Sequence, residues 1–174
     1  MKEKLENIVK SINDIKYGYV DKDNNIHTNI KLSFFKDNYK FISIDDIKDK
    51  KIGTCYEQTK YINYLLDLEN IDYRTFFIEI KNEKVDNHTF TVVEDNNKYY
   101  LLDATWLLQE YVYECDSLDE AIIKELKQFP KMFHLTGFDI KDVDIYEIDM
   151  IEKSLGYQEL IEYFRSFDKY ELND

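Results

Sequence analysis

The feature that most constrains the fold is a run of three β-rich segments that directly follows one well-marked helix. Residues 73–81, 89–93 and 98–102 are rich in aromatic and β-branched side chains, which favour strands. A polar turn at 95–97 joins the last two segments as a hairpin. Short connections make neighbouring strands antiparallel. The chain is therefore predicted to be an α+β protein whose antiparallel sheet packs against helices on one face.

The helix before these strands has a clear beginning. Thr54 is followed three residues later by Glu57, which is the capping-box pattern of a helix N-terminus. Cys55 should therefore be the first residue of a helix that runs to about Glu69, with Asn70 closing it in the left-handed conformation. The first turn of a helix carries unpaired N–H groups and the positive end of the helix dipole, so it favours a thiolate over a thiol. A cysteine at the start of a helix is, however, more often a small buried apolar residue than a nucleophile.

Periodicity predicts the remaining elements. Apolar residues at three- and four-residue steps indicate an amphipathic helix over about residues 2–16. A helix over 118–129 is expected to stop at Pro130, because proline cannot donate a helical hydrogen bond. Residues 143–149 alternate as in a strand, and 158–167 are typical of a last helix.

Length and composition bound the class of protein. The 174 residues, of which 44% are apolar, suffice for one core, so we expect a single domain over 1–174 with its central part at about 50–110. With one proline and four glycines, no linker is visible, and 17–35 is predicted to be irregular or a hairpin.

The charge balance excludes some partners. The net charge of −13 argues against nucleic-acid binding, because phosphate contacts need a basic face; it mildly favours cationic substrates. No apolar run approaches the roughly 18 residues of a membrane span, the N-terminal segment does not resemble a signal peptide, and two cysteines make no disulfide framework. We therefore expect a cytoplasmic protein without membrane contact. The sequence leaves the oligomeric state open.

A histidine and an aspartate flank the predicted hairpin. If Asp95 and Asn96 form a two-residue turn, residues whose numbers sum to 191 face each other, and His88 and Asp103 are such a pair. A longer turn would shift this register by one or two residues. A carboxylate beside a histidine fixes its tautomer and stabilises imidazolium, which a cysteine–histidine nucleophilic pair requires.

These segments resemble the transglutaminase-like superfamily, in particular its compact bacterial members. Gly53-Thr-Cys55 is similar to the G-x-C start of the nucleophile helix, Asn87-His88-Thr-Phe90 to the histidine strand, and the stretch from Lys98 to Asp103-Ala-Thr-Trp106 to the ending D-x-T-W. The resemblance covers roughly residues 50–110. It implies a papain-related fold and acyl transfer or amide hydrolysis through a thioester, but it does not imply a particular substrate, because a fold does not fix a function. We expect a protein or peptide substrate, with an amine acceptor as an open alternative to water.

The sequence thus predicts a cysteine-dependent hydrolase or acyltransferase. Cys55 is the nucleophile, His88 the general base and then acid, and Asp103 the orienting carboxylate. This chemistry needs no metal or organic cofactor. Hydrolysis is favoured over crosslinking, because nothing in the sequence marks an amine-selective site.

Four further residues are candidates for substrate or oxyanion contacts. The backbone N–H of Cys55 is the default oxyanion donor, and Tyr17, Tyr19 or Gln58 could add a side-chain donor. Half-buried packing is the more usual role for the two tyrosines, and a solvent-facing helix position is the more usual one for Gln58. Trp106 is expected to be a core anchor next to the site, with a role as substrate wall as the alternative.

Two other interpretations stay open. Cys55, His88 and Asp103 are all possible zinc ligands, but a closed structural site needs four ligands and the sequence has no Cys-x-x-Cys pair. The chain could also be an inactive member that binds a protein or peptide partner, because a fold does not fix a function.

The remaining cysteine and histidines have ordinary interpretations. Cys115 lies between Glu114 and Asp116, whose charges disfavour its thiolate, so it should be the slower thiol. No pattern suggests a carboxylate or thiol partner for His27 or His134, and both are predicted to be ordinary surface or core residues.

Overall fold

The computed structural model describes residues 1–81, 87–105, 112–132 and 139–173. The predictions for Trp106 and His134 lie outside the described residues. Among the described residues, no helix combines the length and the apolar character needed to cross a membrane.

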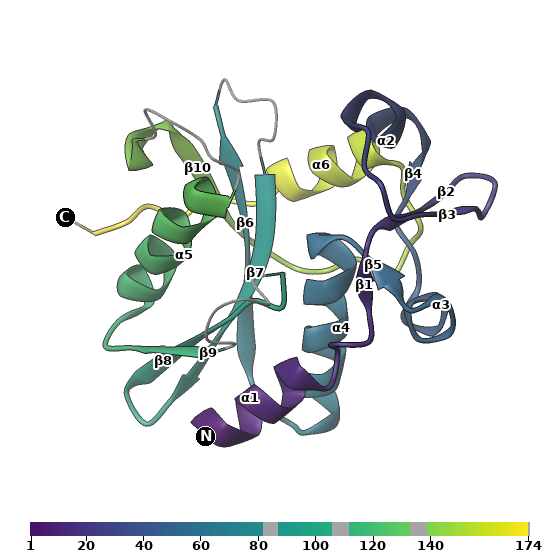
Figure 1. Ribbon diagram of the computed structural model, residues 1–174. Helices are drawn as coiled ribbons and strands as arrows, with labels where there is room; N and C mark the ends of the chain where they lie inside the picture. Colours follow the sequence, from purple (N-terminus) through teal and green to yellow (C-terminus); the bar gives the residue numbers. More distant parts are fainter. Residues whose placement is uncertain (82–86, 106–111, 133–138, 174) are drawn as a thin grey trace.

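A five-stranded antiparallel sheet forms the centre of the molecule, with the strand order β10-β6-β7-β8-β9 (Figure 1). Its strands are β6 (Tyr73–Ile80), β7 (Asn87–Asp95), β8 (Lys98–Leu102), β9 (Val112–Cys115) and β10 (Val143–Ile148). The run from β6 to β8 confirms the three predicted strands, and β10 confirms the fourth. Strand β9 was not predicted.

Helices cover both faces of this sheet, so the prediction of helices on one face was wrong (Figure 1). Val93 and Leu102 join one core cluster with α1 and α4, while Val92 and Leu101 join another with α5. Neighbouring strand residues point to opposite faces, and here both faces are apolar. The helices are α1 (Lys2–Lys10), α2 (Leu32–Asn38), α3 (Ile44–Lys50), α4 (Cys55–Leu68), α5 (Leu118–Met132) and α6 (Tyr157–Arg165), with a 3₁₀ turn η1 (Ile140–Asp142).

Two helix ends differ from the sequence prediction. Helix α1 ends at Lys10, yet Ile12 and Ile15 stay buried, because the next residues continue in tight i→i−3 turns that preserve the apolar face. Helix α5 runs to Met132, so Pro130 does not end it. A proline in the last turn removes a single hydrogen bond near an end where the helix would stop anyway.

Two small sheets hold the N-terminal third. Strand β1 (Lys16–Tyr17) pairs in parallel with β5 (Ile52–Gly53), while β2 (Tyr19–Asp21) lies between β3 (Ile26–His27) and β4 (Tyr39–Lys40). The β1–β5 pair places Tyr17 beside Gly53. Gly18 joins β1 to β2. A Cβ at this position would lie 2.4 Å from the carbonyl oxygen of His27 on β3, so only glycine fits there. The helix α2 replaces part of the predicted irregular segment.

The β7–β8 hairpin turns at residues 96–97, which both have positive φ. Asp95 opposes Lys98, so facing residues have numbers that sum to 193, and the predicted register was wrong by two residues. Side chains alternate with a period of two, so this shift leaves His88 and Asp103 on the same face, as diagonal neighbours.

Candidate active site

Cys55 is the first residue of α4, as predicted. The Glu57 carboxylate accepts hydrogen bonds from the Thr54 backbone N–H at 2.8 Å and from the Thr54 hydroxyl at 2.6 Å. The Tyr39 hydroxyl donates to the same carboxylate. A Cβ on Gly53 would lie 2.6 Å from the Cβ of Glu57, which explains the glycine two residues before the cysteine. The predicted capping box is confirmed.

Polar contacts hold the start of α4 against β7. The Thr59 hydroxyl donates to the backbone carbonyl of Thr89 at 3.0 Å, and one turn later the Thr91 hydroxyl donates to the Asn63 amide oxygen at 2.6 Å. All four side chains are buried. The helix N-terminus is thereby fixed next to the strand that carries His88.

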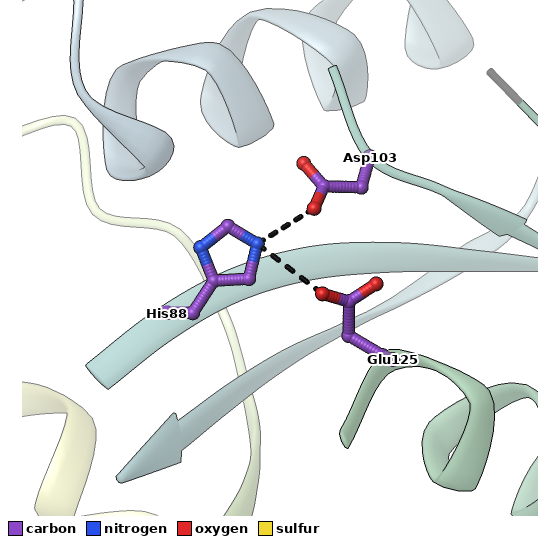
Figure 2. Close-up of side chains that lie close together, drawn as sticks. All are labelled: His88, Asp103 and Glu125. Carbon is purple, nitrogen blue, oxygen red and sulfur yellow. Dashed lines mark hydrogen bonds and ion pairs between the residues drawn. The ribbon is translucent and has the colours of Figure 1, made fainter. Parts of the chain in front are cut away.

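His88 and Asp103 form a direct hydrogen bond. The distance from Nε2 of His88 to Oδ2 of Asp103 is 2.7 Å (Figure 2). Asp103 lies one residue beyond β8, and its Oδ1 accepts the backbone N–H of Thr105 at 2.8 Å. Both side chains are buried. The carboxylate therefore fixes the imidazole from a rigid position at the end of a strand.

The second ring nitrogen of His88 points away from the carboxylates (Figure 2). Burial on its own lowers the pKa of His88, but the charge and hydrogen bond of Asp103, followed by the hydrogen bond and charge of Cys55, raise the pKa well above its usual value. Because Nε2 is hydrogen-bonded to Asp103, we assign the contact with Cys55 to the other ring nitrogen, Nδ1. The imidazole therefore links the thiol and the carboxylate.

A third ionisable side chain reaches His88 from the other helix layer. Oε1 of Glu125, on α5, lies 3.6 Å from Nε2 of His88 (Figure 2). The sequence prediction missed this residue. A signal was present, because Glu125 falls on the apolar face of α5 together with buried Ala121, Ile122 and Leu126.

His88, Asp103 and Glu125 form a group of possible metal ligands, with donor atoms within 4.8 Å of one another. The group does not contain Cys55, which was part of the zinc interpretation. Two ligands of a tetrahedral zinc ion lie about 3.3 Å apart when the bonds are about 2.0–2.1 Å long. The 2.7 Å between Nε2 and Oδ2 is a direct hydrogen bond and does not fit adjacent zinc ligands.

A cavity of about 260 Å³ opens beside Cys55 and His88. Its described walls are mostly apolar and aromatic. They come from the N-terminal segment, α2, the start of α4, the start of β7 and the start of α6, namely Tyr17, Ile30, Leu32, Phe35, Lys36, Thr54, Tyr56, Asn87 and Tyr157. Lys36 lies 5.3 Å from the ring centre of Tyr157. The site thus has a mostly apolar space next to its thiol.

Asn87 is a second residue that the sequence prediction did not assign to the site. The Tyr56 hydroxyl donates to its amide oxygen, and its amide nitrogen donates to the Tyr157 hydroxyl at 2.8 Å. This bridge joins α4, β7 and α6 at the cavity wall. The only sequence signal for it was its place next to His88.

The candidates for a second oxyanion donor lie in different places. Tyr17 lines the cavity, and the backbone N–H of Cys55 hydrogen-bonds its hydroxyl oxygen. Burial of this oxygen, followed by the charges of Cys55, Glu57 and Asp103, raises the pKa of Tyr17 well above its usual value, although the residue as a whole is 43% exposed. The hydroxyl therefore stays protonated next to the thiol.

Gln58 is buried, so its predicted solvent-facing position was wrong. Its amide nitrogen donates to the Gly53 carbonyl at 3.4 Å, and its amide oxygen accepts from the Thr105 hydroxyl at 3.3 Å. It ties the start of α4 to the segment after Asp103.

Tyr19 is buried in an aromatic cluster and is not among the described cavity walls. Its ring stacks on His27 at 4.8 Å. Nε2 of His27 lies 2.8 Å from Oδ2 of Asp21, so this histidine has a carboxylate partner that no sequence pattern suggested. The hydrogen bond from His27 is the main cause that lowers the pKa of Asp21 to about 2.

Comparison of the chain with protein-family models, with curated proteins and with solved structures gives no match. The resemblance to the transglutaminase-like superfamily therefore stays a prediction from the motifs.

Proposed function

We propose that this chain is a thiol-dependent hydrolase or acyltransferase of the transglutaminase-like kind, with Cys55, His88 and Asp103 as its catalytic residues. The observation that carries the proposal is the arrangement of these three side chains at a helix N-terminus beside a cavity, in which His88 hydrogen-bonds Asp103 and is in contact with Cys55. This is the arrangement of nucleophile, base and orienting group that covalent catalysis requires.

The proposed reaction begins with transfer of the Cys55 thiol proton to Nδ1 of His88. The sulfur attacks the carbonyl carbon of an amide or ester, and His88 returns the proton to the leaving nitrogen or oxygen as its bond to carbon breaks. The product is a thioester. Water, or an amine acceptor, then attacks the thioester while His88 accepts its proton, and the thiol is released.

The electrostatics of the site suit the first step. Asp103 stabilises the imidazolium, and the helix N-terminus stabilises the developing thiolate. General acid–base catalysis of this kind contributes about 10²–10⁴-fold in rate. We assign oxyanion stabilisation to the backbone N–H of Cys55 and the hydroxyl of Tyr17. These two groups lie next to each other, because the N–H of Cys55 donates to the Tyr17 oxygen.

The cavity favours an apolar acyl group. Leu32 and Phe35 from α2 and Tyr157 from α6 surround the space next to the thiol, and burial of an apolar group there is favourable by about 25 cal/mol per Å². An aromatic or branched acyl side chain of a peptide or protein substrate fits these walls better than a charged one.

The experiment is acylation by p-nitrophenyl phenylacetate, followed by intact-mass analysis and peptide mapping. The Cys55 sulfur–carbonyl bond forms, the ester C–O bond breaks and p-nitrophenolate leaves, so one phenylacetyl group should appear on Cys55. C55A should not be acylated and C115A should be acylated normally. Absence of an adduct, or equal labelling of Cys115, would favour the inactive binding module.

Leu32 and Phe34 provide a matched pair for the acyl specificity. Both lie on α2 and are 37% and 45% exposed, but of the two only Leu32 is among the described cavity walls. L32S should lower the rate of phenylacetylation about tenfold through lost apolar contact and leave acetylation by p-nitrophenyl acetate unchanged. F34S should change neither rate. Equal effects of both substitutions on both esters would contradict an apolar acyl site.

A further inference from the structure

Glu125 is buried against the side of His88 that faces away from Cys55. The side chains of His88, Asp103 and Glu125 are 2%, 5% and 0% exposed. Nε2 of His88 lies 2.7 Å from Asp103 and 3.6 Å from Glu125, so Asp103 is the direct acceptor of the imidazole proton and Glu125 is not (Figure 2).

Two carboxylates in one dry site do not both ionise readily. The donor atoms of the three residues lie within 4.8 Å of one another, and a single imidazolium balances only one negative charge. Asp103 already accepts hydrogen bonds from His88 and from the backbone N–H of Thr105, so both of its oxygens act as acceptors. Glu125 is therefore the group that keeps its proton, and Asp103 is the neighbouring acceptor for that proton.

We infer that Glu125 is a positioning residue, a neutral carboxylic acid that donates a hydrogen bond to Asp103 and so fixes the carboxylate that orients His88. The inference rests on the proposed function in one respect: the proposed function is what gives the orientation of His88 a catalytic purpose. It differs from a metal role, in which Glu125 would be ionised, and from a second triad carboxylate, which would accept the imidazole proton.

The protonation of Glu125 should make the stability of the folded protein depend on pH. Burial, followed by the charge of Asp103, raises the pKa of Glu125 well above its usual value, while His88 opposes the shift. Among the described residues, Asp103 and His88 are the titratable groups that act on it. Between the pKa of the unfolded chain, about 4.3, and the raised folded value, the folded state binds the extra proton, so stability falls as pH rises.

Three variants test the inference. E125Q keeps a donor for Asp103 and has no charge, E125M removes the donor at similar size, and Q128M alters a buried residue about one turn further along α5. The first measurement is urea unfolding from about pH 4.5 upward. The ratio of the unfolding equilibrium constant of the wild type to that of E125Q should rise with pH, by up to about tenfold per pH unit in this window. The corresponding ratio of the wild type to Q128M should stay constant, because both proteins keep Glu125.

The second measurement is the pH titration of the His88 ring by NMR. E125Q should leave the pKa of His88 unchanged, because its amide still donates to Asp103. E125M should raise that pKa, because Asp103 loses a donor and attracts the imidazolium more strongly. Q128M should have no effect. An ionised Glu125 would predict the opposite, a lower pKa of His88 in both E125Q and E125M, and this result would overturn the inference.

These readouts need no substrate, so the two proposals fail separately. If Cys55 is never acylated while the unfolding and NMR results are as expected, the proposed function is wrong and the hydrogen-bond role of Glu125 stands. If Cys55 is acylated and E125M leaves the pKa of His88 unchanged, as E125Q should, the positioning role is wrong. Stoichiometric zinc that is lost in both Glu125 variants would also overturn it.

Discussion

The two cysteines of this protein are both buried, yet they lie in opposite surroundings on the two sides of one sheet. Cys55 begins α4, lines a cavity and contacts His88. Cys115 ends β9 and packs in the core cluster of α5. Burial first, then the charge of Glu120, raises the pKa of Cys115, while Lys124 lowers it.

This difference corrects the sequence argument about Cys115. The flanking carboxylates of Glu114 and Asp116 do raise its pKa, as predicted, but they are smaller causes than burial. Burial alone thus does not decide the chemistry of a thiol. A helix N-terminus, an imidazole and an adjoining cavity distinguish Cys55 from a cysteine that is only packed.

The largest expected effect is the difference in reactivity of the two thiols. At neutral pH, iodoacetamide should alkylate Cys55 on the order of 10³-fold faster than Cys115, because His88 can accept the Cys55 proton and the cavity gives the reagent access to the sulfur. Peptide mapping after short exposure measures both rates. In urea the two rates should become similar, which is the control. Preferential labelling of Cys115 in the folded protein would contradict the assignment of Cys55 as the nucleophile.

Removal of the imidazole should affect only one of the two thiols. H88Q should slow alkylation of Cys55 about 10²-fold, the lower end of what a general base contributes, and leave Cys115 unchanged. The measurement is the same peptide mapping, with circular dichroism to verify folding. An unchanged rate at Cys55 would mean that its contact with His88 has no chemical consequence.

The smallest expected effect concerns the stability contributed by Cys115. Its folded pKa is raised, so its proton stabilises the folded state below the unfolded value of about 8.5, and this contribution is lost as pH rises towards the folded pKa. The destabilisation caused by C115A should therefore shrink by at most about 2 kcal/mol between pH 8 and pH 10 in urea unfolding. A constant difference over this range would show that burial does not hold the thiol proton.

The sequence by itself determined the elements that depend on neighbours along the chain. The capping box of Thr54 and Glu57 set the start of α4 and the place of Cys55, because its hydrogen bonds span only three residues. The hairpin brought His88 close to Asp103 even though the register was wrong, since an error of two residues keeps the same face of a strand.

Tertiary packing decided what depends on distant segments. Glu125 meets His88 only because α5 folds onto the second face of the sheet, and the cavity exists only because α2 and α6 pack beside the start of α4. The apolar pattern of a helix predicts which of its faces is buried but not against which partner. Contacts between residues far apart in the chain follow from the packing of whole elements, and no local spacing encodes that packing.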